Sequence, residues 1–508
     1  MTASERLWIV LTVAMLTLAG SSAGIVCGSS VFGVGLLALA VPWHRQPLWS
    51  WAALYLRRHR GVVLSPPSTA VNDRCAGGVR YQGDVAAVAV QILGRAYVPT
   101  LLTGSNSSRT TNTLDVARLA PLLDQGLGLR LDSISLISTG SRRRNAGDYA
   151  AVYDTLIGTP PYAGMRETWL VVRMRGLGNA DSLKFRPSVG SAAVAAAQRI
   201  AADFRRQGIH AKVASSAEML TLEGKLGGPE LSHRHNWRSV RGDAGWLTTY
   251  AYKSADITTE ALAQAWSLRV DGVTSNITVF PDRTATATLT VRSAQPPKEP
   301  PNARLLTMPG EQTDAIAAAM CAPFPRLLSI RRSPIPDSLT VPIGPSGVLI
   351  GKTAAGERLL VPMASPGEPS RVHIAADDTI AKRLIIRAAA AGDRITVHTK
   401  DTARWERLRM PNIAVVDQAR PVPGTTLSVV DGTIFPANRP NTTFVVSPRG
   451  APVPTTPDVT IVQSTPTTVS ISAAGITSEA DVELFRAENR YTTSDPEATT
   501  LPELEFAE

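Results

Sequence analysis

The stretch from Leu7 to Val41 contains no charged residue, and it constrains the fold more than any other feature of the sequence. A helix of about 35 residues would be about 52 Å long, whereas the hydrocarbon core of a bilayer is about 30 Å thick. Since one span would need a strong tilt, the stretch predicts two transmembrane helices joined by a tight turn. The turn is expected at residues 20–24 or at residues 27–30.

The charges on either side of this stretch predict its orientation. Glu5 and Arg6 precede it, whereas a series of arginines that includes Arg57, Arg58 and Arg60 follows it. The positive-inside rule then predicts a multi-pass inner-membrane protein with its soluble part in the cytoplasm. Residues 1–64 are expected to form the two transmembrane helices and a basic juxtamembrane helix, whose Arg57, Arg58 and Arg60 contact anionic lipid headgroups. The alternative is a signal peptide that is cleaved near Ala23.

The remaining sequence predicts an α/β protein with two cytoplasmic domains. Strand and helix patterns alternate from residue 79 to residue 294, with the clearest strands at 84–93 and 168–175 and the clearest helix at 191–208. Helical spacing also occurs at 114–127. A proline-rich segment at 295–302 separates this part from a second domain at 303–474. Within the second domain, residues 370–399 have the pattern of a strand, a helix and a second strand, which predicts a degenerate βαβ unit and a parallel sheet.

The charge of the chain is unevenly distributed. The formal net charge is +10. Residues 479–508 contain nine acidic and two basic residues, which gives −7 for this tail and +17 for the remainder. Residues 477–508 are therefore predicted to form a disordered acidic tail. The basic residues are scattered and aromatic residues are sparse, so nucleic acid is not expected as a partner.

Several motifs resemble catalytic or binding sites without meeting their requirements. SGVLIGKT (346–353) lacks the first glycine of a phosphate-binding loop, and GLGNAD (176–181) lacks the third glycine of a dinucleotide-binding loop. The loop AADDT (375–379) follows a predicted strand but is acidic, which suits a helix start rather than a phosphate. No catalytic, cofactor-binding or metal-binding residue is therefore predicted, and no cofactor is expected.

The remaining candidates are also better explained by structure than by chemistry. His233 and His235 have no companion ligands at metal-binding spacing, so they are expected in a solvated loop. The basic run at 141–145 is expected to be a solvated face, with lipid headgroup contact as the alternative. The three cysteines, Cys27, Cys75 and Cys321, do not form a disulfide framework.

The order of these features resembles the EccE family, a membrane component of the type VII (ESX) secretion system of mycobacteria. The resemblance includes the N-terminal apolar pair and the segments RYQGDVAAVAVQI (80–92), RETWLVVRMR (166–175), VPIGPSGVLIGKT (341–353) and IIRAAAAGDRITV (385–397). It implies a non-enzymatic structural subunit that supports assembly of the export machinery together with EccB, EccC and EccD, of which EccC is the ATPase. The alternative function is a membrane-anchored enzyme that depends on a nucleotide or a sugar nucleotide.

Overall fold

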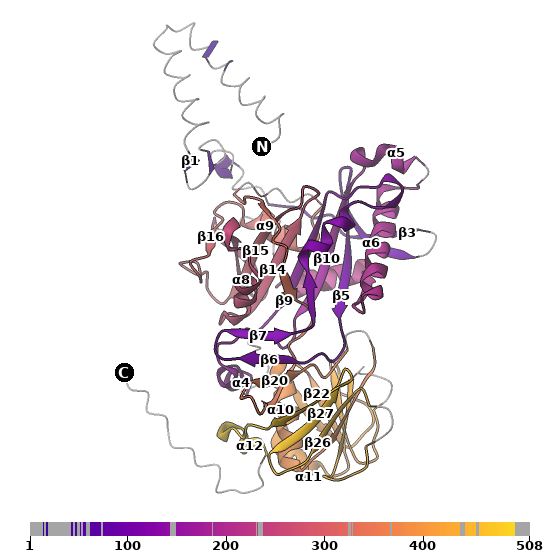
Figure 1. The fold of residues 1–508 in the computed structure, drawn as a ribbon, viewed down its shortest axis with the longest axis vertical. Coiled ribbons are helices and arrows are strands. Elements are labelled where there is room, and N and C mark those ends of the chain that lie inside the picture. Colours follow the sequence, from indigo (N-terminus) through magenta and orange to yellow (C-terminus); the bar gives the residue numbers. More distant parts are fainter. Residues whose placement is uncertain are drawn as a thin grey trace.

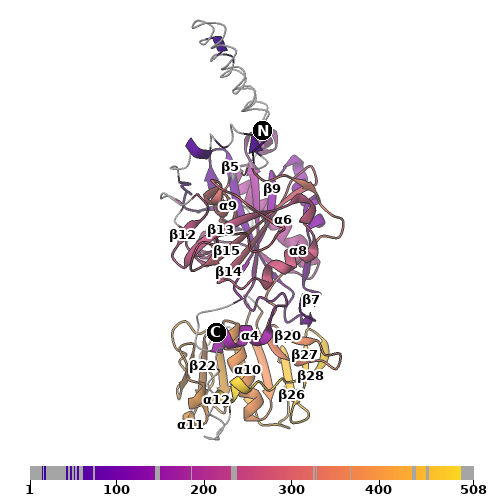
Figure 2. The ribbon, with the colours of Figure 1, turned by 90° about the vertical axis from the view of Figure 1, so that its left-hand side faces the viewer.

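The computed structural model describes most of the chain from residue 61 to residue 492. Within that range it leaves out residues 73–74, 143–148, 185, 230, 232–236, 324–326, 328, 366–367, 437–441 and 454–456; before it, only residues 14, 17, 18, 42, 43, 46, 47, 51 and 54–56 are described. The described residues form two units that follow one another along the long axis of the molecule (Figures 1 and 2).

The first unit is built on a sheet in which every pair of neighbouring strands is antiparallel. Its main strand order is β12-β13-β15-β14-β9-β10-β5-β4-β3, while β11, β16 and β17 pair with β5, β13 and β15. The strands are β3 (Ser68–Val71), β4 (Ala76–Gln82), β5 (Val85–Gly94), β9 (Ser133–Gly140), β10 (Glu167–Arg175), β11 (His210–Val213), β12 (Val240–Gly242), β13 (Gly245–Tyr252), β14 (Gly272–Val279), β15 (Thr284–Ser293), β16 (Leu305–Thr307) and β17 (Ser333–Pro334).

Both faces of this sheet are buried. Along β5 the side chains of Val88 and Val90 enter one hydrophobic core and those of Ala87 and Ala89 enter another, as the alternation of a strand requires. Helix α6 (Val189–Arg206) covers the first face, where its alanines allow a close approach to the sheet. Helices α7 (Ser216–Lys225) and α9 (Gln312–Ala319) contribute to the core on the second face.

The second unit contains a mixed sheet with the strand order β23-β22-β24-β25-β21-β26-β27-β28-β19-β20-β6-β7. The pairs from β23 to β26 are parallel and the pairs from β26 to β7 are antiparallel. The strands are β6 (Thr100–Thr103), β7 (Ser107–Thr110), β19 (Val348–Lys352), β20 (Arg358–Val361), β21 (Ser370–Ala375), β22 (Ile395–Thr399), β23 (Ile413–Val416), β24 (Leu427–Asp431), β25 (Thr442–Ser447), β26 (Val459–Gln463), β27 (Thr468–Ala473) and β28 (Ile476–Asp481).

Helix α10 (Asp378–Ala391) lies between β21 and β22 in sequence and is almost completely buried in the second core. It ends at Gly392, which has a φ of 126° and therefore suits the end of the helix better than a residue with a Cβ atom. Strands β24 and β25 lie between β21 and β22 in the sheet. The connection from β21 to β22, which contains α10, therefore passes over two strands. The described residues from 370 to 399 thus follow the strand, helix and strand pattern of the sequence.

Two segments from the first half of the chain belong to the second unit. Strands β6 and β7 follow β5 in sequence but extend the second sheet next to β20. Helix α4 (Tyr149–Ile157) lies in sequence between β9 and β10 of the first sheet, yet it packs against α10. A short antiparallel pair, β8 (Thr113–Asp115) with β18 (Thr340–Pro342), adds a further link between distant segments. The two units are therefore interleaved along the chain.

Short helices and one isolated strand pair complete the described structure. The strand pair is β1 (Pro42–Trp43) with β2 (Gln46–Pro47). The helices are η1 (Val116–Leu119), η2 (Pro121–Leu123), η3 (Gly126–Gly128), η4 (Leu177–Asn179), α5 (Ala180–Leu183), η5 (Ser254–Asp256), α8 (Thr259–Gln264), η6 (Ala265–Ser267), α11 (Thr402–Trp405), η7 (Glu406–Leu408), η8 (Arg486–Glu488) and α12 (Asn489–Thr492).

The predicted fold class is wrong in three respects. Strands dominate the described structure, and the first unit has an antiparallel sheet in place of the expected α/β arrangement. The helix expected at 114–127 is a strand followed by three short 3-10 helices, because Pro121 and the glycines at 126 and 128 interrupt it. The tail predicted to be disordered from residue 477 is ordered in β28, η8 and α12; residues 493–508 lie outside the described part.

The predicted transmembrane hairpin has no support in the structure. Among the described residues, no helix is both long and apolar enough to cross a bilayer. Apart from residues 14, 17 and 18, the predicted hairpin at 7–41 lies outside the described residues. The same is true of Arg57, Arg58 and Arg60, which were expected to contact lipid headgroups.

Candidate functional site

The segment that resembles a phosphate-binding loop is a central strand of the second sheet. Residues 348–352 form β19 between β28 and β20. The Lys352 ammonium group lies 2.7 Å from a carboxylate oxygen of Glu483. A Cβ atom added at Gly351 would lie 2.2 Å from the carbonyl oxygen of Asp481. Because the neighbouring strand occupies this space, the backbone cannot wrap around a phosphate.

The other glycine motif, at residues 176–181, forms the turn η4 and the start of α5. The amide of Asn179 accepts a hydrogen bond from the backbone of Arg130 at 2.7 Å and donates to the Arg175 carbonyl at 2.8 Å. Its polar groups therefore hold a neighbouring loop of the same chain in place.

Polar side chains gather at the carboxyl ends of parallel strands in the second unit, where open α/β sheets often bind ligands. The Arg404 guanidinium contacts both Asp378, at the start of α10, and Asp431, at the end of β24, where the N–O distance is 2.9 Å. The indole nitrogen of Trp405 donates to Asp431 at 2.6 Å. The hydrogen bond from Arg404 lowers the pKa of the Asp378 carboxyl. The Lys382 ammonium group also lies 3.4 Å from Asp378, so two cations of the chain itself balance the two carboxylates.

The predicted basic surface at 141–145 is not fully exposed. Arg142 is buried and lies 3.0 Å from the buried carboxylate of Asp154, and it donates to the carbonyl of Pro160 at 2.7 Å. Burial lowers the pKa of the Arg142 guanidinium. Residues 143–145 lie outside the described part of the chain.

The structure contains no evident metal or disulfide site in its described part. His233 and His235 fall outside the described residues, and no group of three potential metal ligands occurs among those that are described. Cys75 and Cys321 are both free thiols. Cys321 is completely buried, and burial raises its pKa to about 12.

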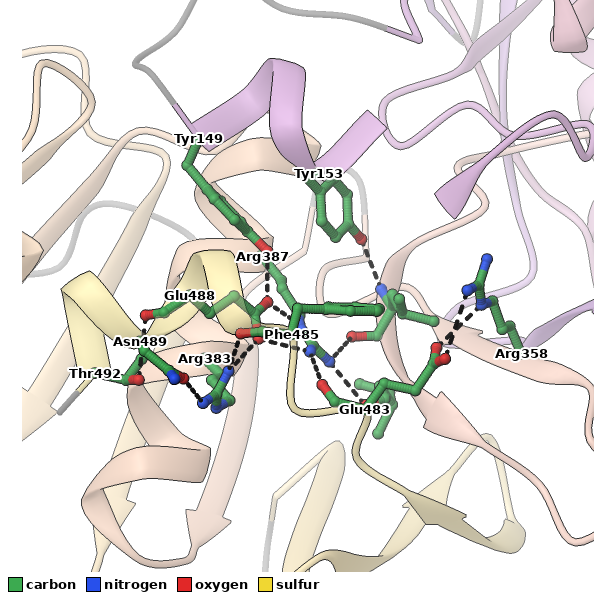
Figure 3. Close-up of polar contacts among 12 residues, drawn as sticks. Tyr149, Tyr153, Arg358, Arg383, Arg387, Glu483, Phe485, Glu488, Asn489 and Thr492 are labelled. Atoms are coloured by element: carbon green, nitrogen blue, oxygen red, sulfur yellow. Dashed lines mark hydrogen bonds and ion pairs between the residues drawn. The ribbon is translucent and has the colours of Figure 1, made fainter. Parts of the chain in front are cut away.

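The most highly charged buried cluster of the second unit surrounds Glu488 (Figure 3). The Glu488 carboxylate is 0% exposed, and it accepts hydrogen bonds from Arg383 at 2.6 Å and from Arg387 at 2.7 and 2.9 Å. The hydroxyl of Tyr149 donates to the same carboxylate at 2.5 Å. Every strong acceptor position of the carboxylate is therefore used, which offsets much of the cost of burying the charge.

This Glu488 cluster joins three distant parts of the chain. Tyr149 lies on α4, the two arginines lie on α10, and Glu488 ends η8 in the C-terminal segment. Arg387 also donates to the carbonyls of Ile350 at 3.0 Å and Glu483 at 2.5 Å, so one guanidinium binds a central strand and the C-terminal segment together. The cluster fixes α4 and the C-terminal segment on the same helix.

Tyrosine side chains extend the cluster toward the first unit. The rings of Tyr149 and Tyr153 lie 6.0 Å apart, and those of Tyr153 and Tyr162 lie 6.2 Å apart. The Tyr153 hydroxyl accepts a hydrogen bond from the Leu349 backbone amide at 2.8 Å. Burial raises the pKa of Tyr153 to about 12. Burial raises the pKa of Tyr149 and Tyr162 as well, so all three tyrosines are uncharged groups packed between the units.

Direct backbone contacts continue the link between the units. The Ser346 amide donates to the Ala163 carbonyl at 2.9 Å, and the Arg166 guanidinium donates to the Gly344 carbonyl at 2.8 Å. A Cβ atom added at Gly164 would lie 2.7 Å from the Ala391 carbonyl oxygen at the end of α10. The segment before β10 is thus locked against the second unit by contacts that leave no room for a larger residue.

The sequence alone does not single out the Glu488 cluster. Glu488 falls in the stretch predicted to be an acidic tail, and charged residues in such a tail are normally solvated. The apolar residues Val482, Phe485 and Tyr491 within the same stretch were the available signal, since they pack into or against the second core. The arginines of α10 gave a second signal, because a mostly apolar helix with two arginines needs a buried partner for them.

Comparisons with known proteins agree with the resemblance found in the sequence. Residues 162–252 match a family model described as "Putative type VII ESX secretion system translocon, EccE". The ESX-2 secretion system protein EccE2 of Mycobacterium tuberculosis is 45% identical over 487 residues, which covers 91% of each chain. The ESX-1 protein EccE1 of the same species is 26% identical over 73% of this chain, and the ESX-5 protein EccE5 of Mycobacterium marinum is 25% identical over 58% of it. The chain belongs to the EccE family of the ESX secretion systems.

Proposed function

We propose that the chain is a non-enzymatic structural subunit of a type VII (ESX) secretion complex, where it supports assembly and stability of the export machinery. The observation that carries this proposal is the 45% identity over 91% of both chains with a protein named as part of the ESX-2 secretion system. Similarity over this length includes both units and the segments that link them.

The structure supports a mechanical role over catalysis. The strongest polar clusters of the described part are ion pairs closed within the chain, at Glu488, at Arg404 and at Arg142. A general acid or base needs access to a substrate and a pKa near the working pH. These clusters instead join helices and strands that are distant in sequence, as expected of a rigid structural subunit.

We further propose that the partners are the other membrane components of the same system, EccB, EccC and EccD, and that the complex acts at the inner membrane. ATP hydrolysis is assigned to EccC by the family resemblance, so the chain itself needs no nucleotide site. This assignment agrees with the Lys352 and Arg404 contacts, since both cations already have carboxylate partners.

The test is purification of the tagged chain at native expression in a mild detergent, followed by native electrophoresis and identification of co-migrating proteins. The expected result is one large species that contains EccB, EccC and EccD. A chain that migrates alone while the other components form their complex would contradict the proposal. Calorimetric titration with ATP and with a sugar nucleotide tests the enzyme alternative, and micromolar binding would favour it.

A further inference from the structure

A cavity of the first unit is lined in part by Trp51, from the segment that follows the N-terminal apolar stretch. Its volume is about 530 Å³, which is within the range of sites for small molecules. Its walls come from β13, β16 and the residues just before α9. Figure 1 shows β16 and α9 on the side of the first unit that lies nearest to β1. The cavity is therefore close to the point where the chain enters the first unit.

Two tryptophans from different parts of the chain line the cavity. The rings of Trp51 and Trp237 lie 6.3 Å apart and are tilted by 33°. Trp237 is held in place because the Gly310 amide donates to its carbonyl at 2.8 Å and because a Cβ atom at Gly310 would lie 2.8 Å from its ring. Leu306 adds an apolar side chain to the wall. Amphipathic tryptophans beside apolar side chains suit a ligand with an apolar chain.

Charged side chains line the cavity without an ion-pair partner among the described residues. Arg238 and Lys298 line the cavity and are exposed, and neither forms an ion pair within the described part of the chain. Glu299, which is also exposed, lines the same cavity. Two free cations can bind a phosphate, and a free carboxylate can bind an ammonium group. Elsewhere the arginines that line internal contacts are paired, as at Arg142 and Arg404.

We propose that this cavity binds one phospholipid, with the phosphate at Arg238 and Lys298 and part of an acyl chain against Trp51 and Trp237. Glu299 would then contact the ammonium group of a phosphatidylethanolamine headgroup. A ligand in this position would touch both Trp51 and β16, and it would fix the segment before the first unit onto the sheet. Lipid binding and assembly into a secretion complex are separate properties, because the former needs only the purified chain.

The proposal is tested with the full-length chain in mixed micelles of a nonionic detergent and a phospholipid that carries a diazirine in its acyl chain. After irradiation, mass spectrometry maps the crosslinked peptides. We expect crosslinks in residues 237–251 and 297–309 in addition to those in the apolar stretch at 7–41. Crosslinks confined to 7–41 would overturn the proposal. Suppression of the cavity crosslinks by free glycerol phosphate as strong as that by unlabelled phospholipid would also overturn it.

A pair of variants makes the test specific. Arg238→Gln with Lys298→Gln is expected to lower the affinity at the cavity by about 30-fold, the effect of two cations close to a phosphate, and to leave the crosslinks at 7–41 unchanged. The matched control is Lys400→Gln with Arg420→Gln, which removes the same charge from exposed positions of the second unit. Equal loss of cavity crosslinks in both variants, or no loss in the first, would refute the assignment. Phosphatidylethanolamine and phosphatidylglycerol probes separate the contribution of Glu299.

Discussion

Replacement of Glu488 by Gln is expected to destabilise the second unit strongly. The substitution keeps the size of the side chain but removes the charge that faces two buried arginines, and it turns one acceptor into an N–H donor opposite a guanidinium. Arg387 is 0% exposed, so water cannot replace the lost partner. Removal of one partner from a buried ion pair costs about 3–5 kcal/mol. For a unit of this size, about 1 kcal/mol shifts the Tm by about 2–4 °C, so the expected decrease is about 6–20 °C.

The assay is thermal unfolding of the full-length chain in detergent, followed by intrinsic fluorescence. Glu479→Gln is the matched control, because Glu479 is an exposed residue of β28 close in sequence, and its Tm is expected to stay within about 2 °C of the unmodified chain. The reasoning about the cluster would be refuted if the Tm of Glu488→Gln were as high as that of the control. If the Tm falls by this amount, less of the Glu488→Gln variant should be found in the secretion complex. Native electrophoresis measures this fraction.

Three further results are expected from the same structure. Gly164→Ala should lower the free energy of unfolding by about 1–3 kcal/mol because the new methyl group meets a backbone carbonyl. Gly224→Ala should be neutral or stabilising, because Gly224 lies in a helix with open space around it. A urea titration that ranks the two variants the other way would contradict this. Burial lowers the pKa of His398, so the neutral imidazole is favoured in the folded state. Its contribution to the free energy of unfolding is complete above the unfolded pKa of about 6.5 and is lost as the pH falls through the folded pKa. His398→Gln should therefore flatten the fall in Tm between about pH 7.5 and pH 5.5, and an unchanged slope would argue against it. In a Cys27→Ser chain, a maleimide should leave Cys321 unmodified until the protein unfolds, because its thiol is buried and its pKa is raised to about 12; rapid labelling of the native chain, detected by peptide mapping, would disprove this.

Local patterns predicted single elements well. The apolar run at 168–175 is β10, and the helical pattern at 191–208 is α6, which begins after a Ser188 cap and ends before Gly208. Both signals depend on neighbours within one element, and a sequence displays these directly. The alternation of strands and helices was misleading because it does not fix strand direction, and the first sheet is antiparallel throughout.

Long-range features could not be predicted in the same way. Nothing in residues 100–110 indicates that they pair with β20, because β20 lies far away in sequence and no residue pattern marks the two strands as partners. The burial of Glu488 depends on Tyr149, Arg383 and Arg387 meeting at one point, and each of these residues alone would be expected at a surface. The apolar residues of the tail and the arginines of α10 indicate burial, but only the fold shows that these groups meet at one site. The incomplete phosphate loop, in contrast, can be recognised from spacing alone.

The interleaving of the two units means that they cannot be isolated by cutting the chain between them. A fragment that begins at residue 303 would lack β6, β7 and α4, and it would expose the arginines of α10 and the edge of β20 to water. Conversely, a chain cleaved within residues 295–302 should remain a single particle, because each fragment supplies pieces that complete the other. Co-expressed halves are thus expected to reconstitute the protein, while either half alone should aggregate.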